Sequence, residues 1–89
     1  MHRVQISFQV TEVEKNLLED VAYLEPWLPD AIDHRKRRGN HYQVRLDGEE
    51  VRDCLDALLY ESNYGVNRQR KVELLALAEK VRGYARLKI

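Results

Sequence analysis

The alternation of apolar and polar residues near the N-terminus is the feature that most constrains the fold. Over residues 3–10, apolar side chains occupy every second position, at Val4, Ile6, Phe8 and Val10. A period of two over this length is typical of a β-strand with one buried and one solvated face. Such a strand needs both a partner strand and a layer of structure over its apolar side, and the rest of the chain must supply them.

A second, shorter alternation predicts the partner strand. Tyr42, Val44 and Leu46 are separated by polar residues, which again indicates a strand with one buried face. The pattern does not decide whether the two strands run parallel or antiparallel. Two strands form only a marginal sheet by themselves, so we expect helices to cover it on one side.

Two capping boxes mark the starts of helices. Thr11 with Glu14, and Asp47 with Glu50, each place a side-chain acceptor three residues before a carboxylate that can reach back. The first box predicts a helix from Glu12 to about Leu24. The second predicts a helix whose apolar face comprises Val51, Cys54, Leu55, Leu58 and Leu59.

A final helix is expected from Asn67, a suitable capping residue, to about Leu87. Its main apolar face is formed by Leu74, Leu77, Ala78, Val81, Tyr84 and Ala85. A second set of apolar residues falls roughly on the opposite side, at Val72, Leu75 and Leu87. One interpretation is that the helix is wedged between the sheet and the preceding helix of the same chain. The other is that this second set binds a partner, and both interpretations stay open.

The segment between the first helix and the second strand contains a run of four basic residues. "EPWLPD" (residues 25–30) ends the first helix, and Pro29 is well placed as the first residue of a second, short helix. Its acids come first and its bases last, as the helix dipole favours, and Gly39 would form a left-handed C-cap. "PWLP" also has the composition of a proline-rich ligand, but a turn with Trp27 on the core is the favoured interpretation.

These elements predict one α+β domain over residues 1–89. The order is strand, helix, short helix, strand, helix, helix, with a two-stranded sheet covered on one face by the C-terminal helical hairpin. The chain carries 15 basic and 15 acidic residues, but their order is blocked. Residues 34–46 hold five bases and no acid, whereas residues 47–61 hold six acids and one base. Opposite blocks can satisfy each other within one molecule or between two.

The sequence offers little for catalysis or for a metal. His2, His34, His41 and Cys54 lack the paired spacing of metal ligands, and Cys54 lies on an apolar helix face, which favours a packing role. The four glycines are scattered, so no phosphate-binding loop is present. We therefore expect no enzyme activity, no cofactor and no metal. One cysteine, with no apolar leader or membrane-length segment, predicts a cytoplasmic protein without a membrane partner.

Two functions remain. The first is a protein-interaction or regulatory module that acts as a homodimer, through the spare edge of the first strand or through Val72, Leu75 and Leu87. The second is nucleic-acid binding by the basic residues, with Trp27 or Tyr42 stacking on a base, although alternation places Tyr42 inward. The acidic blocks on either side oppose it. The basic residues are Arg35, Lys36, Arg37, Arg38 and Arg45.

Overall fold

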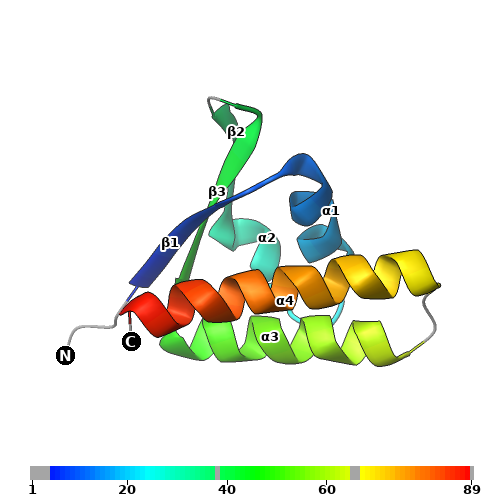
Figure 1. Ribbon diagram of the computed structural model, residues 1–89. Coiled ribbons are helices and arrows are strands. Elements are labelled where there is room, and N and C mark those ends of the chain that lie inside the picture. The colour runs from blue at the N-terminus through cyan, green and yellow to red at the C-terminus, as the bar shows by residue number, and fades with distance from the viewer. Residues whose placement is uncertain (1–4, 38, 65–66, 89) are drawn as a thin grey trace.

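The computed structural model describes residues 5–37, 39–64 and 67–88, and it is an α+β fold (Figure 1). The strands form one antiparallel sheet in the order β1-β3-β2. The elements along the chain are β1 (Gln5–Val10), α1 (Glu12–Asp20), α2 (Leu28–Ala31), β2 (Ile32–Arg37), β3 (His41–Asp47), α3 (Gly48–Asn63) and α4 (Arg68–Lys88).

The sheet has three strands, so the prediction of two strands was wrong. The two predicted strands, β1 and β3, are adjacent and antiparallel, in continuous register from Gln5 opposite Asp47 to Val10 opposite Tyr42. The additional strand β2 forms a hairpin with β3, with Ile32 opposite Val44 and a register shift after Asp33.

Residues 35–37 of the basic run lie on β2, so the prediction that these bases end a helix was also wrong. Arg38 lies outside the described residues. Helical structure there is limited to the four residues of α2, which contain Pro29. Gly39 and Asn40 both adopt positive φ, at 77° and 61°, and thereby reverse the chain between β2 and β3. Glycine and asparagine tolerate this conformation best, so Gly39 serves a hairpin turn and does not cap a helix.

The core lies between one face of the sheet and the helices, as predicted. The alternate residues Ile6, Phe8 and Val10 of β1 are buried, and Tyr42 of β3 points inward with them. Phe8 stacks on Tyr84 of α4, with ring centroids 5.2 Å apart and 15° between the ring planes. Figure 1 shows α3 and α4 side by side as a hairpin below the strands.

Both predicted capping boxes are formed. The Thr11 hydroxyl accepts from the backbone N–H of Glu14, whose carboxylate accepts from the backbone N–H of Thr11. The Asp47 and Glu50 pair does the same at the start of α3. Helix α1 ends at Asp20, earlier than expected, and turns follow it. In this segment Trp27 packs against the core and its Nε1 donates to Glu25. Of "PWLP", Pro26 and Trp27 lie in the turn between the helices, as predicted, whereas Leu28 and Pro29 begin α2.

None of the helices in the described ranges combines the length and the apolar character that crossing a membrane requires.

Candidate interaction surfaces

The outer edge of β1 is the first candidate surface. Strand β1 is at one end of the sheet, and over the described ranges it pairs only with β3. Its register with β3 is uninterrupted over all six residues, and its side chains alternate strictly between exposed and buried. A regular edge strand presents unpaired N–H and C=O groups at fixed spacing, which is a template for another strand.

The opposite edge of the sheet differs in this respect. Three residues of β2, from His34 to Lys36, lie opposite the single residue Tyr42 between the pairs Asp33–Gln43 and Arg37–His41. Bulges of this kind break the regular spacing of backbone donors and acceptors and twist the strand. Edge-to-edge pairing is therefore favoured at β1 and disfavoured at β2.

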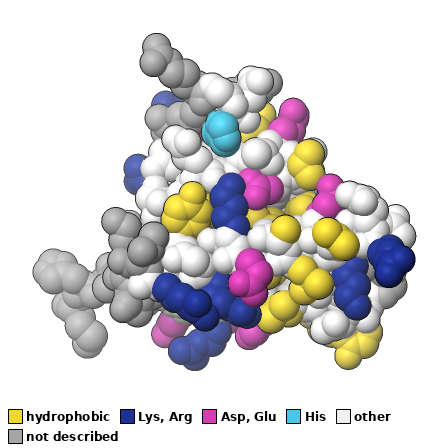
Figure 2. All heavy atoms as spheres, viewed as in Figure 1, with side chains coloured by type: hydrophobic (Ala, Val, Ile, Leu, Met, Phe, Trp, Pro, Cys, Tyr) yellow, Lys and Arg dark blue, Asp and Glu magenta, His cyan; other side chains and the backbone are white. Residues whose placement is uncertain are grey.

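The outer face of α4 is the second candidate surface. Val72 is 58% exposed and Leu75 is 38% exposed, so these two residues are not wedged between the sheet and α3. The side chain of Leu87, the third predicted partner-binding residue, lies outside what the structure describes. Figure 2 shows apolar side chains gathered over α4, on the face of the molecule where Figure 1 shows β1 crossing in front of the other strands.

The uncovered face of the sheet is the third candidate surface. It contains a depression of about 490 Å³. Arg35 of β2 and Arg45 of β3 both line it, so the fold brings together two of the five predicted nucleic-acid-binding residues. Polar, aromatic and acidic side chains complete the lining, among them Gln5, Trp27, Asp30, Gln43 and Glu50.

The two arginines of this depression differ in their partners. Arg35 donates to the carboxylate of Asp33 from Nε at 3.2 Å and from Nη2 at 3.1 Å, and this hydrogen bonding raises the pKa of Arg35. The side chain of Arg45 has no hydrogen bond or ion pair within the described part of the chain. The side chains of Lys36 and Arg37, and the whole of Arg38, lie outside the described residues. Of the two arginines that line the depression, Arg45 is thus the one available to a ligand.

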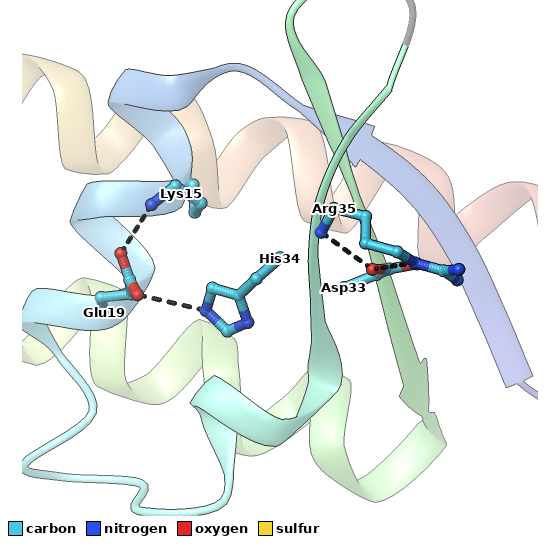
Figure 3. A network of polar contacts seen from close by, with 5 residues as sticks. All are labelled: Lys15, Glu19, Asp33, His34 and Arg35. Carbon is cyan, nitrogen blue, oxygen red and sulfur yellow. Dashed lines mark hydrogen bonds and ion pairs between the residues drawn. The ribbon is translucent and has the colours of Figure 1, made fainter.

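His34 and Arg35 point to opposite sides of β2 (Figure 3). His34 reaches α1, where its Nε2 lies 3.3 Å from Glu19, and Glu19 also accepts from Lys15 at 3.0 Å. The hydrogen bond from Lys15, together with the one to His34, lowers the pKa of Glu19 against the effect of burial. This network attaches the basic strand to α1, so it has a structural role.

Cys54 is a packing residue, as the sequence predicts. Its side chain is buried in the core, and burial, with a smaller effect of the Glu25 carboxylate, raises the pKa of the thiol to about 12. A buried thiol with a raised pKa is a poor nucleophile at neutral pH. In the described ranges, no three histidine, cysteine or acidic side chains are grouped as a metal site requires.

Three exposed tyrosines form a surface that the sequence analysis missed. Tyr23 is 64% exposed, Tyr60 49% and Tyr64 61%. The rings of Tyr60 and Tyr64 lie 4.5 Å apart, and the Tyr23 hydroxyl donates to the Glu61 carboxylate. The available signal was the spacing of Tyr60 and Tyr64, which are four residues apart at the end of a helix.

No protein-family model, curated protein or solved structure matches this chain. Its function is therefore argued from the geometry of these surfaces.

Proposed function

We propose that the protein is a non-catalytic interaction module that acts as a homodimer. The observation that carries this proposal is the outer edge of β1, a regular six-residue strand with no partner in the described chain on that side. A second copy supplies an identical edge. Two such edges pair antiparallel about a twofold axis and close the interface, because the same surface is used by both subunits.

Pairing of this kind would extend two three-stranded sheets into one of six strands. The apolar faces of both copies of β1 would stay on the helix side, because side chains alternate across a strand. The residues on the open face, Gln5, Ser7 and Gln9, would then lie near their counterparts across the axis. Polar side chains at these positions are compatible with a solvated outer face of the extended sheet.

The exposed apolar residues of α4 support the same interface. Val72 and Leu75 lie on α4, and apolar side chains over α4 appear on the same side of the molecule as β1 (Figures 1 and 2). Burying the exposed part of each of these two side chains would contribute about 1 kcal/mol to the free energy of association. This hydrophobic contribution to the free energy of association adds to that of the backbone hydrogen bonds at the edge of β1. Neither contribution requires a catalytic group.

The decisive test is the molar mass in solution. Light scattering after size exclusion, over about 1 to 100 µM, should give the dimer mass at the upper end of this range. The double variant Val72→Glu with Leu75→Glu should weaken the dimer, whereas Arg52→Glu, an exposed position on α3, should not. A monomer at every concentration would refute the proposal.

Cross-linking tests the strand edge directly. Cysteine would be placed singly at Gln5, Ser7 or Gln9, and the buried Cys54 would remain unreactive. We expect mild oxidation to join two chains most efficiently at the position nearest the twofold axis. Arg52→Cys is the matched control on α3. Equal cross-linking at all four positions would indicate random collision and contradict pairing through β1.

A second candidate is nucleic-acid binding, which the position of Arg45 beside Arg35 favours. Fluorescence anisotropy with mixed-sequence DNA and RNA, at low and at moderate salt, tests it. Micromolar affinity that falls steeply with salt and is reduced by Arg45→Gln would support this function. Absence of binding at low salt would exclude it.

A further inference from the structure

The exposed tyrosines at the end of α3 form one aromatic face with the segment that follows α1. Tyr60 and Tyr64 contact each other through their rings, and Tyr23 is attached to α3 through Glu61. We call Tyr23, Tyr60 and Tyr64 the tyrosine face. Tyrosine is enriched at protein interfaces because it presents a large, rigid contact area that also forms hydrogen bonds.

The charge around the tyrosine face defines the chemistry of its partner. Asp56 and Asp53 lie one and two turns before Tyr60 on the same side of α3, and Glu61 follows it. In the described part of the chain, no carboxylate of α3 forms an ion pair, whereas Glu14, Glu19, Asp20, Asp33 and Glu79 on other elements all do. Negative charge therefore lies beside the exposed rings, and no cation among the described residues forms an ion pair with it.

We propose that the tyrosine face binds an arginine-bearing segment of another protein. A guanidinium stacks on a tyrosine ring through cation–π attraction and donates to carboxylates at the same time. Lysine has the charge but lacks the planar group, so arginine should be preferred. This proposal does not depend on dimerisation, because it uses α3 and neither β1 nor Val72 and Leu75.

The basic run of a second copy is the competing occupant, and the contacts of Arg35 disfavour that residue as the ligand. Arg35, the only residue of residues 35–38 whose side chain is described, is already bound to Asp33 in its own chain. Binding it to the tyrosine face would require that contact to break. A separate arginine-bearing partner has no such cost.

The test uses the full chain and three short peptides, of alternating serine with arginine, lysine or glutamate. Isothermal titration calorimetry at low and moderate salt should show binding of the arginine peptide, with weaker binding at moderate salt. The lysine peptide should bind about threefold to tenfold more weakly, and the glutamate peptide should not bind. Equal affinity for the arginine and lysine peptides would overturn the proposal.

Variants locate the site. Tyr60→Leu keeps an apolar side chain but removes the aromatic ring, and Asp56→Asn removes one charge, so each should weaken arginine-peptide binding about threefold to tenfold. Glu79→Gln is the control, because it makes the same charge change as Asp56→Asn on the exposed face of α4. Affinities unchanged by both α3 variants would place the peptide elsewhere. A change of oligomer mass in Tyr60→Leu would instead identify a second copy as the occupant, and also overturn the proposal.

Discussion

The contact between Phe8 and Tyr84 tests whether the C-terminal helix is what covers the sheet. Phe8 is 4% exposed and stacks on Tyr84 of α4 at 5.2 Å. Phe8→Ala removes a buried ring and should cost about 3–5 kcal/mol of the free energy of unfolding. A chain of this length has only about 4–13 kcal/mol in total. Phe8→Leu keeps most of the volume and should cost about 1–2 kcal/mol, part of it the lost ring stacking.

A double-mutant cycle isolates the stacking term. Phe8→Leu, Tyr84→Leu and the double variant would be unfolded in urea at one fixed protein concentration, followed by far-ultraviolet circular dichroism and by Trp27 fluorescence. The two changes should couple by about 1 kcal/mol, because the rings touch. The control pair Phe8→Leu with Tyr60→Leu should be additive. Coupling within about 0.3 kcal/mol of zero for Phe8 and Tyr84 would refute the packing of α4 against β1.

Three further predictions follow from single sites. Gly39→Ala should lower the free energy of unfolding by about 1–2 kcal/mol, measured by urea titration, because Gly39 has a φ of 77°; an unchanged midpoint would contradict the turn. Burial acts to raise the pKa of Glu14, but Lys80 and Thr11 lower it below its ordinary value of 4.5, so its stabilising contribution should persist above that pH and disappear on acidification. Lys80→Met should reduce this acid sensitivity in thermal melts at a series of pH values, and an identical pH profile would argue against the ion pair. Cys54 should resist thiol reagents in the native protein and react on unfolding, because burial raises its pKa to about 12; rapid native labelling would contradict its burial.

Local sequence patterns were sufficient to predict β1, α1, β3, α3 and α4, and they were insufficient to predict β2. The alternation at β1 and β3 and the capping boxes at Thr11 and Asp47 act over a few residues, so they can be recognised without the rest of the chain. Strand β2 begins with Ile32 and continues with polar side chains only, so it lacks the alternation that indicates a strand. Its conformation depends on pairing with β3 and on the turn at Gly39 and Asn40, and helix-dipole arguments for its charges were equally consistent with a helix.

The candidate surfaces were predictable to different degrees for the same reason. The exposure of Val72 and Leu75 was one of two outcomes that helical periodicity allowed, and only the packing of α4 decides between them. Arg35 and Arg45 are ten positions apart and share a depression because β2 and β3 are adjacent. Tyr23 and Glu61 are 38 positions apart in the sequence, so no local pattern predicts the contact between them.

The distribution of ion pairs connects these surfaces to function. The basic and acidic blocks at residues 34–46 and 47–61 follow each other in sequence, and the sequence allows them to neutralise each other within one molecule or between two. The fold instead places Arg45 on the open face of the sheet, where Glu50 at the start of α3 shares its depression, and the other carboxylates of α3 lie along a helix that packs on the other side. In the described residues, Arg45 and the α3 carboxylates form no ion pairs, although other cations and acids of the chain do. On a molecule with no net charge, charges without an internal partner can each bind a group of opposite sign, which is the property that both proposed interaction surfaces use.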